Sequence, residues 1–320
     1  MYKKRILLIL FISCSYLIFA NNFTEKIEQF AEENGKGYLQ PFVSAYGANL
    51  NSGLFHTAKV LKPFKFGISI NSMLAFIPKK DKIFVAVRPD LEDPMTGFPV
   101  YSPEEIESAT VFGDQGATFN FSGNPFHFSN EDDLKLPDGL NFNIAPLIIP
   151  QINFGLPLGN EMMFRFFPEI EINSDLGALS FWGIGLKHSL NKNLLKLIPL
   201  DLAIQVVYHS FSIGEIIEMN SFSLNGEVSK KILNWTFYGG LGFNNTKLNA
   251  HYETETEIII GNQPPYIFAT VPTEIDFEIN SKNIVPITLG VSYNIARIDF
   301  FVDYSICKYP VANFGFGLSF

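Results

Sequence analysis

The chain has 320 residues, of which 47% are apolar and 17% are charged, so it can bury a sizeable core and is not a disordered chain. It carries 23 Lys and Arg against 32 Asp and Glu, a net charge of −9. Because no basic cluster follows the N-terminus, binding of nucleic acid through phosphate neutralisation is excluded. The 33 Phe and 12 Tyr, beside only 2 Trp, are more aromatic residues than an ordinary soluble enzyme carries.

Residues 1–20 have the layout of a secretory signal peptide. Three cations at positions 3–5 precede an apolar stretch over residues 6–19, and Ala20 comes directly before polar residues. We therefore expect an exported chain that begins near Asn21 and carries a net charge of −12, from 20 basic and 32 acidic residues. Cys307 is then its single cysteine, so no internal disulfide is expected.

The next segment, residues 21–37, is expected to contain a short amphipathic helix. Phe23, Ile27, Phe30 and Ala31 recur at helical spacing among charged residues over positions 22–34. Such a helix fits either a plug in or under a pore or a lead-in on the periplasmic side.

Beyond residue 20 no apolar run approaches the roughly 18 residues that a membrane helix needs. Period-two alternation over about 10 residues recurs instead, and it predicts β-strands with one apolar face. In 297–307, for example, Ile298, Phe300 and Val302 share one face, and Asp299 and Asp303 share the other. Large apolar residues fill one face and small or polar residues the other, as in a wall that faces lipid.

A strand that spans a bilayer must have all its backbone groups paired, so these strands predict an all-β, closed transmembrane antiparallel barrel over residues 38–320. The candidate strands are 38–48, 65–77, 82–88, 146–156, 161–172, 177–190, 198–211, 218–230, 233–243, 247–260, 266–280, 284–295, 297–307 and 311–320. They make fourteen, or twelve if 38–48 is plug and 247–260 is loop.

The longest insertion is 89–145, which lies on the outer side by strand parity. Its aromatic residues need burial, which favours a segment that caps the barrel or folds into the lumen over a loose loop. These residues are Phe112, Phe119, Phe121, Phe126 and Phe128.

Charged residues on the polar strand faces are the candidate lumen-lining side chains. They would form either a cation-favouring lumen or an ion-pair network that stiffens the wall, and the acids of 274–278 also fit a solvated extension above the membrane. The candidates are Arg165, Glu169, Glu171, Lys187, Glu274, Asp276, Glu278, Arg297, Asp299 and Asp303.

No catalytic, metal or cofactor site is expected. His209 and Ser210 are adjacent, and neighbours in a strand point to opposite faces, so they cannot form a nucleophile and base pair. The five histidines have no metal-ligand spacing.

The chain ends on an alternating strand, with Phe314, Phe316, Leu318 and Phe320 on one side. This ending resembles the C-terminal assembly signal of bacterial outer-membrane barrels. The resemblance implies location in the outer membrane, contact with its lipids, and recognition of Phe316, Leu318 and Phe320 by the barrel assembly machinery.

A wider resemblance rests on four segments: Tyr38 to Phe42, Asn49 to Lys59, Phe66-Gly67 and Ile77 to Lys82. They look like a family of unknown function found among exported Bacteroidota barrel proteins, over most of the mature chain. The resemblance implies the barrel class and no activity. A looser similarity is to long-chain fatty-acid transporter barrels, which have fourteen strands and an N-terminal plug, although their Asn-Pro-Ala plug motif is missing here.

These features favour a monomeric, porin-like barrel that passes or binds a small hydrophobic or amphipathic molecule, gated by the N-terminal segment and by 89–145. The alternative is a non-transporting structural or adhesion barrel whose loops bind a surface partner. A membrane-embedded hydrolase is a third reading, but no triad is visible, and we expect no enzyme.

Overall fold

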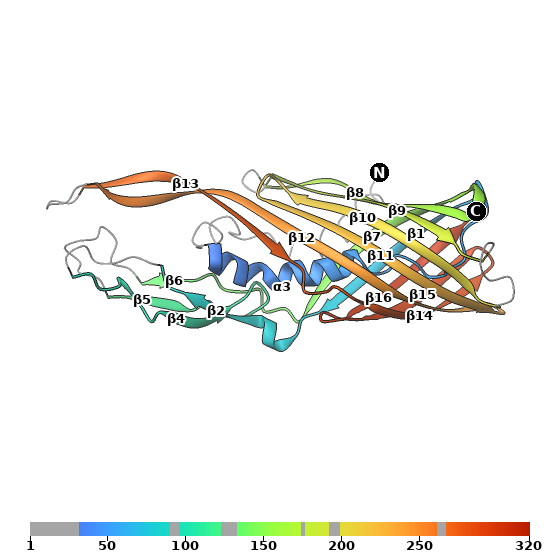
Figure 1. Cartoon of the computed structure of the whole chain (residues 1–320), viewed down its shortest axis with the longest axis horizontal. Helices are drawn as coiled ribbons and strands as arrows, with labels where there is room; N and C mark the ends of the chain where they lie inside the picture. The colour runs from blue at the N-terminus through green and yellow to red at the C-terminus, as the bar shows by residue number, and fades with distance from the viewer. Residues whose placement is uncertain (1–31, 90–95, 123–132, 174–176, 192–198, 261–266) are drawn as a thin grey trace, which may run out of the picture.

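A computed structural model describes residues 32–89, 96–122, 133–173, 177–191, 199–260 and 267–320. Ten antiparallel strands form a closed barrel, because pairing between β11 and β12 joins the two sides of the sheet (Figure 1). Going round the wall, these strands are β11 (Ile217–Ile232), β10 (Asp201–Ile213), β9 (Gly177–Ser189), β8 (Asn160–Asn173), β7 (Ile144–Leu156), β1 (Phe66–Phe76), β16 (Val311–Ser319), β15 (Ile298–Ile306), β14 (Ile287–Ile295) and β12 (Trp235–Ile260).

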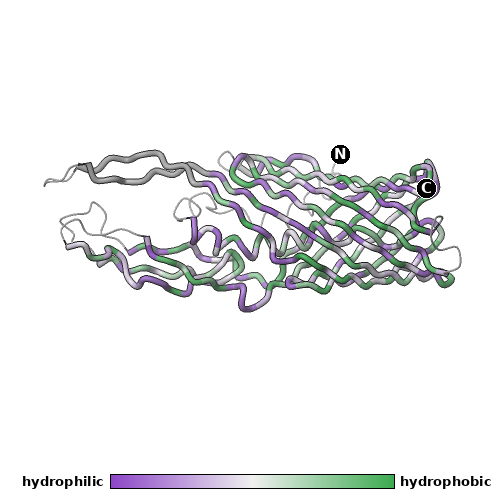
Figure 2. Tube along the Cα trace, in the orientation of Figure 1, coloured by the Kyte–Doolittle hydropathy of each residue, from purple (hydrophilic) through white to green (hydrophobic). Residues whose placement is uncertain are grey.

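Alternation in the sequence produces a wall with an apolar outside and a polar inside. In β10, Gln205 and His209 are buried in the interior, whereas Ile204, Val206 and Tyr208 are exposed on the outer face. Along the barrel, apolar positions alternate with polar ones (Figure 2). The period of two therefore places apolar side chains on the outer face and polar side chains in the interior.

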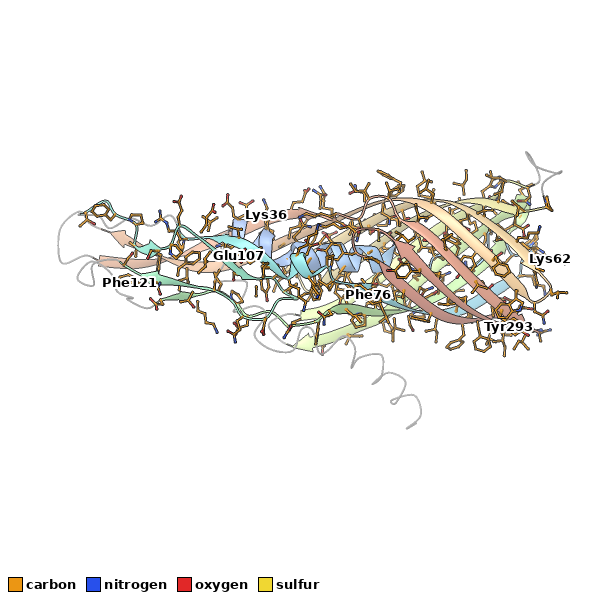
Figure 3. All side chains as sticks on the ribbon, turned by 90° about the horizontal axis from the view of Figure 1, so that it is seen from below. Lys36, Lys62, Phe76, Glu107, Phe121 and Tyr293 are labelled. Atoms are coloured by element: carbon orange, nitrogen blue, oxygen red, sulfur yellow. The ribbon has the colours of Figure 1, made fainter. Side chains whose placement is uncertain are left out.

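The height of the apolar outer face matches a bilayer. β15 has 9 residues, about 30 Å of strand, and a tilt of about 40° reduces this to a height of about 23 Å, close to the apolar band of about 25 Å in outer-membrane barrels. Aromatic pairs flank it: the ring centroids of Trp235 and Tyr293 are 4.5 Å apart, and those of Phe76 and Tyr304 are 6.5 Å apart. Tyr293 lies at the far end of the barrel and Phe76 near the middle of the molecule (Figure 3).

Two segments extend beyond the end of the barrel that is opposite the C-terminus (Figure 1), and we call them together the head. One is 77–143, between β1 and β7, which contains η1 (Lys79–Lys82), β2 (Ile83–Val87), β3 (Tyr101–Ser102), β4 (Glu105–Ala109), β5 (Thr118–Phe121) and β6 (Leu134–Lys135). The other is the hairpin 247–280, where the far part of β12 pairs with β13 (Ile267–Asn280). Three turns at the opposite end are short: η2 (Pro157–Gly159) between β7 and β8, 233–234 between β11 and β12, and 296–297 between β14 and β15.

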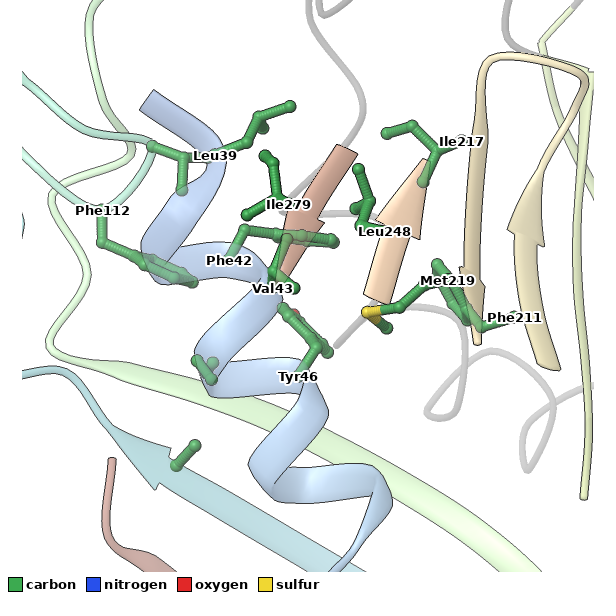
Figure 4. Packing of buried hydrophobic residues seen from close by; sticks show 14 of the residues in the cluster. Leu39, Phe42, Val43, Tyr46, Phe112, Phe211, Ile217, Met219, Leu248 and Ile279 are labelled. Atoms are coloured by element: carbon green, nitrogen blue, oxygen red, sulfur yellow. The ribbon is translucent and has the colours of Figure 1, made fainter. Parts of the chain in front are cut away.

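Helix α3 (Glu32–Leu50) runs from the head into the barrel and contacts β2 and β13 as well as β1, β7, β11 and β12 (Figure 1). Its apolar residues at positions 38, 39, 42, 43 and 46 have helical spacing, and all five are buried. Around them pack Phe112, Leu248 and Ile279 of the head and Phe211, Ile217 and Met219 of the wall (Figure 4). No helix among the described residues is long and apolar enough to cross a membrane.

The predicted strand numbers of fourteen and twelve are both wrong, because the barrel has ten strands. Residues 38–48 lie in α3, and residues 83–87 form a strand that pairs with β4 outside the barrel. The two strands expected over 233–260 are the single strand β12, whose far part continues into the head with β13. Alternation indicates that a strand has one apolar and one polar face. It does not indicate whether the apolar face lies against lipid or against other parts of the protein.

Several sequence predictions concern residues outside the described part of the chain. These are the signal peptide 1–20, the helix expected over 22–34 except for its last three residues, and the aromatic residues Phe126 and Phe128 of the insertion. Residues 32–34 begin α3. Within the insertion, Phe112 and Phe119 are fully buried in the cluster around α3.

Candidate functional site

The barrel lumen is filled by α3 and the residues that follow it, 51–59, which together we call the plug. Asn49, at the end of the helix, donates a hydrogen bond to the carbonyl oxygen of Ala145 at 2.8 Å, and Asn51 donates to the hydroxyl of Ser221 at 2.7 Å. Further along, the amide of Ala58 donates to the hydroxyl oxygen of Ser229 at 2.9 Å. The plug is therefore bound to the wall along its length by specific polar contacts.

Arg165 of β8 is the largest fully buried side chain, and it joins the plug to the wall. Its Nε donates to Oε1 of Gln151 at 2.8 Å, and its Nη1 donates to the carbonyl oxygen of Leu50 at 3.0 Å. Its Nη2 donates to the carbonyl oxygens of Ser52, at 3.1 Å, and Gly53. A guanidinium presents several donors in one plane, so it can satisfy the free carbonyl groups at the C-terminus of α3 together, where a positive charge also suits the helix dipole.

A buried ion pair forms a second anchor. Nζ of Lys187 on β9 lies 3.0 Å from a carboxylate oxygen of Glu227 on β11, and both side chains are almost completely buried. The same ammonium donates to the carbonyl oxygen of Thr57 at 3.1 Å and lies 5.6 Å from the ring centroid of Phe55. Since β9 and β11 flank β10, the pair crosses one strand and holds the plug against the wall.

Asp303 of β15 belongs to a third polar group. Its Oδ2 accepts hydrogen bonds from the hydroxyl of Tyr238 at 2.9 Å and from the side-chain amide of Asn313 at 2.7 Å. Asn313 also faces the plug at Gly53, where a Cβ atom would lie 2.9 Å from its Oδ1. Gly53 has φ +61°, so both its backbone conformation and its close approach to Asn313 require glycine.

Glu161 forms a fourth contact, near the end of the barrel where the C-terminus lies. Its carboxylate accepts from the amide of Leu61 at 2.7 Å and from the side chain of Asn153 at 2.7 Å. A pocket opens beside it between the plug and the wall, and both Lys187 and Asp299 line it. Asp299 is half-buried and accepts from Asn294 at 2.8 Å.

The structure thus brings Arg165, Lys187, Asp299 and Asp303 together in the barrel and places the other candidates elsewhere. Glu169 and Glu171 are exposed, because β8 has a register irregularity between Phe167 and Ile170 that changes which side chains face inward. Arg297 is exposed in the turn between β14 and β15.

The remaining candidates lie on the head hairpin, at the base of which Asp276 pairs with His251 and Glu278 pairs with Lys247 at 2.6 Å. The hydrogen bond from Lys247 lowers the pKa of Glu278, which is fully exposed. The side chain of Glu274 lies outside the described part of the chain.

Sequence reasoning missed Glu161, Glu227, Gln151 and Tyr238 as lumen residues. Each stands on the polar face of an alternating strand, which is a signal present in the sequence. Several of their partners are far away along the chain: Glu161 and Leu61, for example, are separated by 100 positions. The face on which a side chain lies could be predicted, but the residue that it contacts could not.

The closed wall, its apolar exterior and its polar interior define the class: this is a β-barrel of the bacterial outer membrane. The chain belongs to the family DUF6588, a family of unknown function, which matches residues 1–320. The expected links to Bacteroidota and to fatty-acid transporters do not follow from this match.

Two solved structures have similar folds. The outer membrane protease OmpT from Escherichia coli is 9% identical, with a TM-score of 0.33, and the match covers 82% of this chain and 100% of that one. Ail, the attachment invasion locus protein of Yersinia pestis, is 12% identical, with a TM-score of 0.21, and the match covers 81% and 99%. No curated protein matches the sequence.

Proposed function

We propose that this protein is a plugged outer-membrane barrel that displays a rigid head for binding a surface partner. One observation carries the proposal: α3 belongs both to the core of the head and to the filling of the lumen. A segment that only gated a pore would not need to be the central element of a folded structure outside the barrel.

The head is held by a hydrophobic core rather than by the surface contacts of a loop. Leu39 and Phe42 of α3 share one buried cluster with Phe112 and Phe119 of the insertion and Ile279 of the hairpin (Figure 4). Burying one such side chain contributes about 1.5–3 kcal/mol. Withdrawing α3 from the lumen would also remove it from this cluster, so packing in the head stabilises the state in which the plug fills the lumen.

Hydrogen bonds at the base of the head fix its position on α3. The side-chain amide of Asn34 donates to the carbonyl oxygen of Val87 at 2.8 Å, and the Val87 amide donates back to Asn34 at 2.9 Å. On the opposite side, Asn283 donates to the carbonyl oxygen of Ser44 at 2.8 Å. A surface held on two sides in this way is pre-organised for binding, which lowers the entropic cost of association.

Two measurements test the proposal. In planar bilayers the purified protein should give no conductance steps above those of bilayers without protein. Cells that display it should bind to immobilised surface polysaccharides or matrix proteins, and the binding should be lost when 252–275 is replaced by an Asn-Gly turn. This replacement keeps the register pair of His251 and Asp276 and the core residues Leu248, Phe277 and Ile279. Stable ion conduction, or binding that survives the replacement, would contradict the proposal.

Passage of a small hydrophobic or amphipathic molecule is the second candidate function. It is favoured by the continuation of the apolar cluster from the head to wall residues such as Phe181, Phe211 and Met219, which surrounds α3 with apolar side chains. Uptake of a fluorescent fatty acid by protein-containing liposomes, faster than by empty liposomes, would support it.

A further inference from the structure

The end of the barrel with the C-terminus carries a concentration of positive charge. Its short turns identify it as the periplasmic end. Five of the exposed cations at this end are called the basic rim: Lys62, Lys65, Lys230, Lys231 and Arg297. None of them is paired with a carboxylate in the part of the chain that the structure describes. Lys62 lies at this end in Figure 3.

This charge is opposite in sign to that of the whole chain, whose net charge is −9. The acidic side chains near the rim are turned inward or already bonded. Glu161 and Glu227 are buried against the plug, Asp299 accepts from Asn294, and Asp201 is half-buried. The exposed charge of the described rim is therefore positive, apart from the C-terminal carboxylate.

Apolar side chains project from the same turns. Phe64 is 74% exposed, Leu158 is 83% exposed and Leu233 is 86% exposed, more than any other large apolar residue of the described chain. All three have positive φ, between 55° and 64°, a conformation that usually selects glycine or asparagine. Large apolar residues at such positions, facing away from the protein, indicate a surface that meets something apolar.

From these two features we infer that the basic rim binds anionic phospholipids of the inner leaflet, with the cations on lipid phosphates and the three apolar side chains among the acyl chains. Lys62 and Lys65 come before β1, and Lys230 and Lys231 lie near the end of β11. Arg297 lies in the turn β14–β15, and Leu158 lies in the turn β7–β8. Such a distribution around the barrel fits the surrounding lipid better than a protein partner, which would touch one side. It also lies directly beside the aromatic pair Trp235 and Tyr293, which marks the membrane boundary.

The two tryptophans of the chain allow a local test. Trp235 is 47% exposed and follows Lys231 by four residues, whereas Trp182 lies within β9. In a Trp182→Phe background, the protein is reconstituted into vesicles of phosphatidylcholine that contain brominated phosphatidylglycerol or brominated phosphatidylcholine. Quenching of Trp235 by each brominated lipid gives their relative affinity for the rim.

We expect phosphatidylglycerol to be preferred by about fivefold for each cation in contact with it. The double variant Lys230→Gln, Lys231→Gln should bring the preference close to one, and 0.5 M salt should weaken it in the unchanged chain. The matched control is Lys79→Gln, Lys80→Gln, which removes two exposed lysines of η1 on the head and should leave the preference unchanged. A mobility shift between unheated and boiled samples confirms that each variant is folded.

Equal quenching by the two lipids in the unchanged chain would overturn the inference. So would a preference that survives the rim substitutions in folded protein, or one that the η1 substitutions reduce equally. In a Trp235→Phe background, quenching of Trp182 should not respond to the rim substitutions, and a response there would show a general change in the protein instead of a local lipid site.

Discussion

Substitution of Arg165 by Met tests whether this residue holds the plug in place. Met has a similar length and no charge, so it fills the space of the side chain and removes the donors. Four acceptors then lose their partner: Oε1 of Gln151 and the carbonyl oxygens of Leu50, Ser52 and Gly53. Gln151 belongs to the wall, so three of these acceptors lie on the plug. At about 1 kcal/mol for each plug carbonyl left without a donor, the plug loses about 3 kcal/mol relative to the wall.

A loss of about 3 kcal/mol corresponds to an increase of about 150-fold in the equilibrium for local opening of the plug. Hydrogen exchange of the protein in nanodiscs, followed by mass spectrometry, measures this directly. Peptides that cover residues 45–58 should exchange about 150-fold faster in the variant. Peptides from the wall strands should not change, because the ladder hydrogen bonds of the wall remain.

Arg297→Met is the matched control, since Arg297 is exposed in the turn between β14 and β15. It removes the same group from a position with no plug contact and should leave the exchange of 45–58 unchanged. Unaltered protection of 45–58 in folded Arg165→Met protein would refute the argument that Arg165 anchors the plug. Equal effects of the two substitutions would refute it as well.

Three further predictions concern other contacts. Lys187→Met leaves the buried carboxylate of Glu227 without its partner and should lower the free energy of unfolding by about 3–5 kcal/mol in a denaturant titration. The double variant Lys187→Met, Glu227→Gln should lose less stability than the sum of the two single changes. Gly53→Ala should destabilise the plug by about 1–2 kcal/mol through its left-handed backbone, and faster hydrogen exchange at 45–58 without a change in the wall would demonstrate this. The pKa of Glu278 is lowered by its hydrogen bond with Lys247, so this contact stabilises the hairpin at pH values above the ordinary glutamate pKa and is lost as the pH falls through the lowered pKa. Lys247→Gln should therefore raise the pKa of Glu278, which carboxyl NMR titration would measure. An unchanged pKa would contradict the role of Lys247.

The wall strands could be predicted because their signal is local. The strand expected over 65–77 is β1, and the one expected over 297–307 is β15, each within a residue or two. Alternation between lipid and interior repeats every second residue, so a window of about ten residues is enough to detect it. The strand count failed where a strand was not part of the wall, as for Ile83–Val87 in the head.

Helix α3 shows why a buried segment is harder to predict. Tyr38, Phe42 and Tyr46 stand at a spacing of four, which is helical, but buried residues extend around the helix because it is surrounded by head and wall. Without a polar face, the contrast that reveals a helical period is weak. Pro41 within the segment also argues locally against a helix, and the packing around it outweighs that preference.

The sequence by itself determined a closed wall with one face for lipid and one for a polar interior, because each residue's face follows from its position in the strand. Only the tertiary structure decided what fills the interior. Arg165 and Glu169 both lie on the polar face of one predicted strand, yet Arg165 holds the plug and Glu169 is exposed, because the irregularity after Phe167 changes the direction of the side chains. Contacts between residues more than a hundred positions apart depend on closure of the whole barrel, and no local pattern records them.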